Sequence, residues 1–318
     1  MAVKEKPKKK PKSLFELILP EEVPGADKAR YGIFGNNGGG KSSLAASAAK
    51  AGLRVLVASA GVENIKPYKG YGTRIRVHKM RTWEDHYPLI KFLELDLNRP
   101  EVVSGEKRPR FDVVVFDTWT RMQGLASRKI SGWKPPTDLA GLQRALLTAP
   151  KTPRGYQDWQ QIGELSNQWI SYYQDLPIHL VFLFQEQVRT PTSGGADNVI
   201  QTGPTKVGPM LTPLAIEGVR DNLELLGRLY DPSAEIEDDA LEENPFGVPK
   251  HAIDPEVKPE RRLLIGQHPL YITKGPTHVL GNVVMNPTWR KLAPAIGAAP
   301  LEIDDEESEF DATLEEES

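Results

Sequence analysis

One glycine-rich stretch constrains the fold of this chain more than any other feature: Gly35-Asn36-Asn37-Gly38-Gly39-Gly40-Lys41-Ser42. The apolar run 31–34 precedes it and the alanine-rich run 43–50 follows it, an order that indicates a strand, a loop and a helix. The spacing G-x-x-x-x-G-K-S is typical of a phosphate-binding P-loop, whose glycines let backbone N–H groups point inward at a polyphosphate. A merely flexible glycine-rich turn is the alternative, and the flanking strand and helix disfavour it.

The residue types in this loop suit the binding of a nucleoside triphosphate. We expect Lys41 to reach the β- and γ-phosphates and the Ser42 hydroxyl to coordinate Mg²⁺. The following helix would present its positively polarised N-terminus to the anion. ATP and Mg²⁺ are thus the expected ligands, and the predicted nucleotide-binding residues are Gly35, Asn36, Asn37, Gly38, Gly39, Gly40, Lys41, Ser42 and Ser43.

The bulk composition excludes several classes of protein. With 318 residues the chain can bury a full core, as one large α/β domain or two smaller ones. Cysteine is absent, which excludes disulfides and thiolate metal sites and fits a reducing compartment. No apolar run approaches a membrane span, and the run 13–19 is too short and too acidic for a signal peptide. We therefore expect a soluble cytoplasmic protein without a membrane partner.

The net charge of −3 conceals oppositely charged ends. Residues 1–12 carry six lysines against one glutamate, and residues 301–318 carry ten acidic residues and no basic one, which leaves a body charge of about +2. The ends are either solubilising disordered arms, or a basic arm for nucleic acid with an acidic tail that competes for the same surface.

Apolar runs alternate with amphipathic stretches downstream of the loop. The runs predict strands over 54–60, 74–80, 111–118, 178–184 and 223–230, and helices over 82–97, 159–176 and 213–222, with Trp159 in the core. Residues 261–267 and 270–274 are expected to pair as a hairpin. Residues 119–155 read as a mobile basic segment with a short helix near 138–148, and 189–209 as a long loop. This alternation predicts an α/β fold with a mostly parallel sheet, helices on both faces and ligands at the carboxyl ends of the strands.

The most strand-like segment, 111–118, carries an aspartate at its carboxyl end. An apolar strand that ends in aspartate is common, but downstream of a P-loop it is typical of the Walker B strand. Asp117 is therefore expected to bind Mg²⁺, directly or through water, and to act with Ser42 as the metal site.

The order of these elements resembles that of the RecA-like P-loop ATPases, and among them the phage-encoded RecA-core proteins of the Sak type, which are linked to single-strand annealing and recombination. The resemblance runs from about Lys28 to Lys274, and the P-loop is its individually specific motif. It implies a RecA-like fold and DNA-stimulated ATP hydrolysis, in the host-cell cytoplasm if the chain is phage-encoded. It also implies three partners: single-stranded DNA, further copies of the chain in a ring or filament, and a single-strand-binding protein.

Charge pattern and this resemblance together divide the chain into five expected parts. These are a basic, largely disordered arm (1–27), a RecA-like ATPase core (28–231), an acidic loop insertion (232–259), a C-terminal β-hairpin that completes the core (260–296) and an acidic disordered tail (297–318).

The same resemblance implies a catalytic set of Lys41, Glu63, Asp117, Gln185 and Lys274. Glu63 matches the glutamate that orients the attacking water, and an ordinary loop glutamate is the alternative. Gln185 matches the polar residue that ends the strand beside the P-loop strand and senses the γ-phosphate, and a satisfied strand-end amide is the alternative. The family's loops after the Walker B and sensor strands hold DNA, which implies DNA-binding roles for Arg121, Arg128, Lys129, Lys134, Arg189 and Lys206.

One departure from the family concerns a late Lys-x-Arg pair that reaches a neighbouring subunit's nucleotide. Here Lys274 is followed by Gly275-Pro276, so the arginine is replaced by proline. Three interpretations follow: Lys274 acts alone in trans, Arg261 or Arg262 serves instead, or hydrolysis is slow. Other functions compatible with the loop are a nucleotide-switched scaffold that does not bind DNA, a P-loop kinase, and a helicase or packaging motor.

Overall fold

The computed structural model describes residues 28–60, 65–103, 106–132, 155–190, 192–193, 200–201, 203–232 and 260–298. The expected charged ends and most of the acidic insertion lie outside these ranges. The strands of the main sheet are β1 (Arg30–Gly35), β2 (Val55–Ala60), β3 (Ile75–Met80), β6 (Val113–Asp117), β7 (His179–Arg189), β10 (Lys206–Pro209), β11 (Leu225–Tyr230), β12 (Arg262–Leu264) and β13 (Val283–Met285). Two short ribbons pair β4 (Glu101–Val103) with β5 (Glu106–Arg108) and β8 (Thr192–Ser193) with β9 (Ile200–Gln201).

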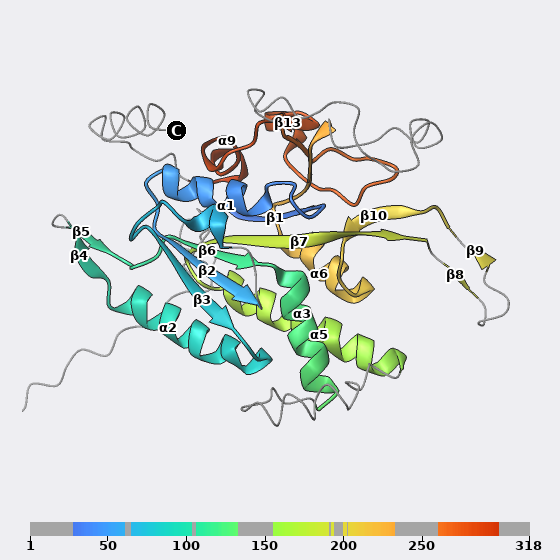
Figure 1. The fold of residues 1–318 in the computed structure, drawn as a ribbon, viewed down its shortest axis with the longest axis horizontal. Helices are drawn as coiled ribbons and strands as arrows, with labels where there is room; N and C mark the ends of the chain where they lie inside the picture. The colour runs from blue at the N-terminus through green and yellow to red at the C-terminus, as the bar shows by residue number, and fades with distance from the viewer. Residues whose placement is uncertain are drawn as a thin grey trace, which may run out of the picture.

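The main sheet has the strand order β13-β12-β11-β1-β7-β6-β2-β3 (Figure 1). Strand β10 is not part of this order and pairs with the last residues of β7. The strands from β11 to β3 in this order run parallel, whereas β12, β13 and β10 pair antiparallel. Strands β2 and β6 are buried along their whole length, which agrees with their unbroken apolar sequences, because a parallel sheet is covered on both faces. The carboxyl ends of the parallel strands form one rim.

Helices cover both faces of the sheet. One face carries α1 (Lys41–Lys50), η3 (Lys66–Tyr68), α9 (Trp289–Leu292) and the neighbouring α8 (Thr277–Leu280) and η6 (Pro294–Ile296). The other carries α2 (His86–Asn98) with its leading turn η4 (Trp83–Asp85), α3 (Trp119–Ile130), α5 (Tyr156–Gln174) and α6 (Pro213–Asn222) (Figure 1). Successive strand residues serve opposite faces: Ile33 packs in the α1-side core and Phe34 in the other.

The segment after β6 is helical, and the prediction of a mobile basic segment from residue 119 was wrong. Trp119, Met122 and Ala126 are buried along one side of α3, a helical spacing that the intervening basic residues obscured. The Trp119 indole N–H donates to Ser166 Oγ of α5 at 2.8 Å, which joins the two helices. Residues 133–154, which include the expected short helix, lie outside the described ranges.

The C-terminal strands pair differently from the prediction. Strand β12 lies between β11 and β13, so both of its edges are occupied and segment 270–274 cannot pair with it. That segment instead contacts two other strands, through bridges from Tyr271 to Val207 of β10 and from Lys274 to Leu226 of β11. The antiparallel extension is therefore built from β12 and β13.

A buried histidine makes the stability of the fold depend on pH. His86 is fully buried, stacks on Trp169 at 4.9 Å, and its Nδ1 lies 2.9 Å from the Tyr173 hydroxyl. Desolvation by burial lowers the pKa of His86 from 6.5 to about 3, against a smaller opposite effect of the Asp85 charge. Below pH 6.5 the unfolded chain therefore binds a proton that the folded chain does not, and stability falls as the pH decreases.

We expect the free energy of unfolding to decrease by about 2 kcal/mol between pH 7 and pH 5 because of His86 alone. Urea unfolding at both pH values would measure this loss in the wild-type chain and in His86→Phe, which has no titrating group at this position. His278→Gln, which replaces an exposed histidine, is the matched substitution. An unchanged pH slope in His86→Phe would contradict the assignment.

Candidate nucleotide site

The P-loop lies at the carboxyl end of β1, between β7 and β11 at the rim of the sheet. Gly35 leaves the strand where no side chain fits, since a Cβ there would lie 2.2 Å from the Leu229 carbonyl oxygen. Gly40 has φ +86° and precedes the first residue of α1, a left-handed conformation that glycine adopts without strain. The loop therefore needs glycine at these positions for close approach and for backbone direction.

The Lys41 side chain folds back over the loop. It is only 7% exposed, and its Nζ donates to the carbonyl oxygens of Gly35 at 2.8 Å and Asn36 at 2.7 Å. Its positive charge is thus held in the loop beside the N-terminus of α1. An anion in this loop would meet both the ammonium group and the helix end.

Asp117 ends β6 with its carboxylate directed at α1. The residue is 3% exposed, and its Oδ2 accepts hydrogen bonds from Ser42 Oγ at 2.8 Å and from the Tyr68 hydroxyl at 2.6 Å. Strand β7 separates β6 from β1, so Ser42 reaches across from the first turn of α1. The two residues predicted to hold Mg²⁺ are therefore brought into direct contact.

The donor set suits Mg²⁺ bound together with a nucleotide. Mg²⁺ keeps several waters and takes one or two protein oxygens plus phosphate oxygens, which Ser42 and Asp117 would supply. Among the described residues there is no group of three or more His, Cys, Asp or Glu side chains that would form an all-protein metal cage. A metal here would neutralise phosphate charge rather than stabilise the fold by itself.

Gln185 lies beside the loop, but the prediction that it ends its strand was wrong, because β7 continues to Arg189. It is level with Gly35 in the β1–β7 ladder, and it shares a face with Leu183 of the α1-side core. Its backbone N–H donates to Thr120 Oγ1 at 3.0 Å, and its carbonyl accepts from the Met210 N–H at 2.7 Å. Gln185 thus connects the rim to α3 and to the segment after β10. Glu63 lies outside the described residues.

Two residues at the site differ from the sequence prediction: Tyr68 was not predicted, and Arg261 was predicted to have another role. Tyr68, in η3, had no motif or periodicity around it, and it is placed on Asp117 only by the packing of η3 against α1. Arg261 was considered for a role in a neighbouring subunit, and it lies instead against Gly40 of its own chain.

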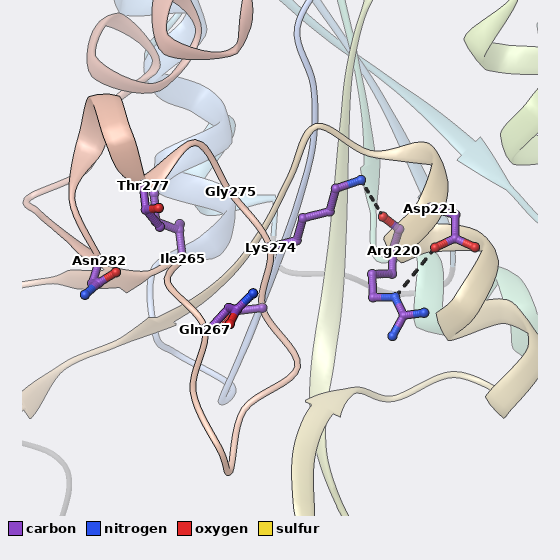
Figure 2. Close-up of a pocket in the computed structure, with 9 residues that line it drawn as sticks. Arg220, Asp221, Ile265, Gln267, Lys274, Gly275, Thr277 and Asn282 are labelled. Atoms are coloured by element: carbon purple, nitrogen blue, oxygen red, sulfur yellow. Dashed lines mark hydrogen bonds and ion pairs between the residues drawn. The ribbon is translucent and has the colours of Figure 1, made fainter.

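Lys274 lies near the amino ends of the parallel strands, whereas the P-loop lies at their carboxyl ends. Its backbone pairs with Leu226, which is level with Gly32 in the β1–β11 ladder. Figure 2 shows its side chain directed toward the end of α6, where Nζ donates to the Arg220 carbonyl at 2.9 Å. It lines a cavity of about 750 Å³ with Gln267 and Asn282 among the other residues. A nucleotide that contacts Lys274 would therefore have to be bound by a neighbouring subunit.

The predicted DNA-binding residues fall into two groups. Arg189 and Lys206 lie directly opposite each other on the β7–β10 ribbon, and both line a cavity of about 530 Å³. Arg121, Arg128 and Lys129 lie on the exposed side of α3. Lys129 is bound to Glu84 at 2.9 Å, a hydrogen bond that is the largest cause of the lowered pKa of Glu84. Lys134 lies outside the described residues.

A buried ion pair supports the strands on either side of β1. Arg228 of β11 and Glu186 of β7 form two hydrogen bonds, Nε to Oε2 at 2.7 Å and Nη2 to Oε1 at 3.2 Å. Both side chains are at most 10% exposed. The Arg228 guanidinium also stacks on the Tyr271 ring, 4.3 Å from its centre. The pair therefore joins the two strands that flank the P-loop strand.

A family model described as AAA domain matches residues 27–230, well over half of the chain. This chain belongs to the AAA domain family. The match covers the P-loop, Asp117 and Gln185 and ends at the last residue of β11, so β12, β13 and α9 of this AAA-domain chain lie beyond it. Together with the parallel sheet and its covered faces, the family confirms the predicted α/β class and RecA-like P-loop NTPase fold, and supports nucleotide binding.

Two solved structures are similar to this AAA-domain chain at low identity. The crystal structure of the RadB recombinase has a TM-score of 0.34 and 11% identity, covering 77% of this chain and 82% of that one. The assembled ATPase EscN of the enteropathogenic E. coli type III secretion system has a TM-score of 0.36 and 15% identity, covering 70% of this chain and 47% of EscN. No curated protein sequence matches significantly.

In the described part of the chain, every helix is too short or too polar to cross a bilayer.

Proposed function

We propose that this AAA-domain chain binds and hydrolyses MgATP, and that the bound nucleotide controls the affinity of the chain for single-stranded DNA. The process would be recombination, annealing or repair of the phage type. Lys41 holds the phosphates, and Ser42 and Asp117 hold Mg²⁺. Glu63 orients the attacking water and Gln185 senses the γ-phosphate. These roles carry over from the family resemblance, and the contacts of Lys41, Ser42 and Asp117 support them.

The observation that carries the DNA role is the continuity of β7. The strand passes from Gln185, level with Gly35, to Arg189, directly opposite Lys206. Four residues of strand span about 13 Å, so one rigid element connects the P-loop rim to a pair of cations. Figure 1 shows the β7–β10 ribbon extending from the body of the sheet as an arm that ends at β8 and β9.

The cavity beside these cations suits a flexible polyanion. Arg189, Lys206 and Arg220 line it together with His268 and Tyr271, and Glu217 is its acidic member. Burial lowers the pKa of the Arg189 guanidinium, so a phosphate at this position would stabilise a partly desolvated charge. Cations that track a backbone are characteristic of sequence-independent binding to single strands.

The proposal includes the assembly of several copies of the chain into an oligomer. Lys274, exposed near the amino ends of the strands, would reach the nucleotide of an adjacent subunit, so that each ATP lies between two copies in a ring or filament. Cross-linking with and without MgATP would test whether the copies associate through this surface.

The test of the DNA role is binding of a fluorescent oligo-dT at several salt concentrations, together with ATP turnover with and without that DNA. Arg189→Ala and Lys206→Ala should each weaken binding and reduce the slope of log K against log salt by about 0.7. Lys91→Ala, on the exposed side of α2, is the matched control and should keep the wild-type slope. The DNA role would be overturned if ATP turnover were the same with and without DNA and no salt-sensitive DNA binding were found. The remaining function would then be that of a nucleotide-switched scaffold.

A further inference from the structure

The C-terminal segment 260–298, beyond the family match, packs along α1. The Trp289 N–H donates to Ser47 Oγ at 2.8 Å, and the Arg290 guanidinium donates to the Lys50 carbonyl at 3.4 Å. The Trp289 ring is buried beside Tyr31 of β1, with 5.7 Å between ring centres. The last turn of α1 is therefore held by this segment, and the same segment also reaches the other end of the helix.

At that other end, Arg261 lies on the P-loop. A Cβ built on Gly40 would lie 2.3 Å from Arg261 Cζ and 2.4 Å from Nη1, so the guanidinium occupies the space beside the residue that precedes α1. The backbone of Arg261 is fixed there: its N–H donates to Asn286 Oδ1 at 3.1 Å and its carbonyl accepts from the Asn286 N–H at 2.7 Å. The main chain from which the guanidinium extends is thus held beside the β12–β13 pair.

Three positive features meet at this point. They are the Arg261 guanidinium, the Lys41 ammonium in the loop and the N-terminus of α1. In the described part of the chain, the Arg261 side chain makes no hydrogen bond and no ion pair, whereas the adjacent Arg262 is paired with Glu260 at 3.2 Å. Like charges held together in this way repel unless an anion lies among them.

We propose that Arg261 binds the phosphate chain of the nucleotide in the P-loop of its own subunit. The inference rests on nucleotide binding at this loop, and it assigns the second cation of the site to the C-terminal segment rather than to the family-matched core. A guanidinium offers planar, paired N–H donors that suit phosphate oxygens, and it keeps its charge at every accessible pH. Nucleotide occupancy would thereby be linked to the docking of the C-terminal segment on α1.

The test compares Arg261→Met with Arg262→Met, which changes the neighbouring, ion-paired and solvent-facing arginine. Equilibrium titration with MgATP and MgADP should show Arg261→Met binding at least about tenfold more weakly than wild type, because a hydrogen bond to a charged group is lost. Arg262→Met should stay within about twofold of wild type. Arg261→Lys should recover part of the loss, and the loss should shrink at high salt because it is electrostatic.

A second measurement separates phosphate binding from a structural role. Without nucleotide, the thermal unfolding midpoint of Arg261→Met should equal or exceed that of wild type, because one of several like charges has been removed. With saturating MgATP, its midpoint should rise less than that of wild type. Wild-type affinity in Arg261→Met would overturn the inference, as would a lowered nucleotide-free midpoint with an unchanged response to MgATP. If the wild-type chain itself fails to bind MgATP, the proposed function fails rather than this inference alone.

Discussion

Lys41→Ala is expected to abolish measurable nucleotide binding and, with it, ATP turnover. The substitution removes the positive charge that the carbonyl oxygens of Gly35 and Asn36 hold in the loop. Charge-assisted hydrogen bonds to phosphate are among the strongest in proteins, and we expect an affinity loss of at least about 100-fold. Calorimetric or fluorescence titration with MgATP measures the loss directly, without depending on the rate of hydrolysis.

Lys50→Ala is the matched control for this prediction. Lys50 ends the same helix and is exposed, so its removal changes the net charge equally and leaves the loop intact. Circular dichroism and the unfolding midpoint of both variants establish that each is folded. A folded Lys41→Ala chain that binds MgATP as tightly as Lys50→Ala would exclude the P-loop as the nucleotide site.

Arg228→Met is expected to cause the largest loss of stability, about 3–5 kcal/mol, because it leaves the Glu186 carboxylate buried without its partner. The loss should appear as a shift of the urea midpoint at constant m value. The double variant Glu186→Leu/Arg228→Met should recover most of it, since apolar side chains of similar size replace the pair without leaving a buried charge.

The exposed pair of Arg262 with Glu260 is the control for the buried one. Its side chains are 38% and 45% exposed, and Arg262→Met should cost no more than about 1 kcal/mol. If Arg228→Met and Arg262→Met cost the same, the Glu186–Arg228 pair is not energetically distinct from a surface pair. If the double variant is no more stable than Arg228→Met, the loss comes from the Tyr271 stacking contact instead.

Those parts of the fold that depend on local pattern could be predicted. The P-loop, the strand that ends at Asp117 and the helix over 213–222 each have a complete signature in a few consecutive residues, and all three are present. The position of Gln185 beside Gly35 also followed, because the resemblance supplied the strand order that local pattern lacks.

The errors arose where long-range packing decides the structure. Helix α3 carries three basic residues and a glycine on its outer side, so its composition resembled a loop although Trp119 and Met122 form a buried stripe. Trp159 was expected in the core, yet it is 48% exposed at the first turns of α5. The strand partner of β12 depended on which edges other strands had already occupied.

Tyr68, which prediction missed, and Arg261, which prediction gave another role, are placed by a common physical cause. Tyr68 and Arg261 act on Asp117 and Gly40 across distant parts of the sequence, and neither belongs to a motif with fixed spacing. Their positions follow from η3 packing on α1 and from the β12–β13 pair, which are properties of the folded sheet. A sequence can indicate which chemical groups the loop itself brings, but not which groups the rest of the chain adds to it.

The return of the C-terminal segment to α1 also has a consequence for biosynthesis. The hydrogen bond from Trp289 to Ser47 joins residues 242 positions apart, and such contacts form late, because a large loop must close first. While the ribosome is still adding residues beyond β11, the emerging chain already contains Lys41, Ser42 and Asp117 but lacks Arg261 and Trp289. The nascent protein should therefore bind nucleotide more weakly until residues 261–289 have emerged and packed on α1.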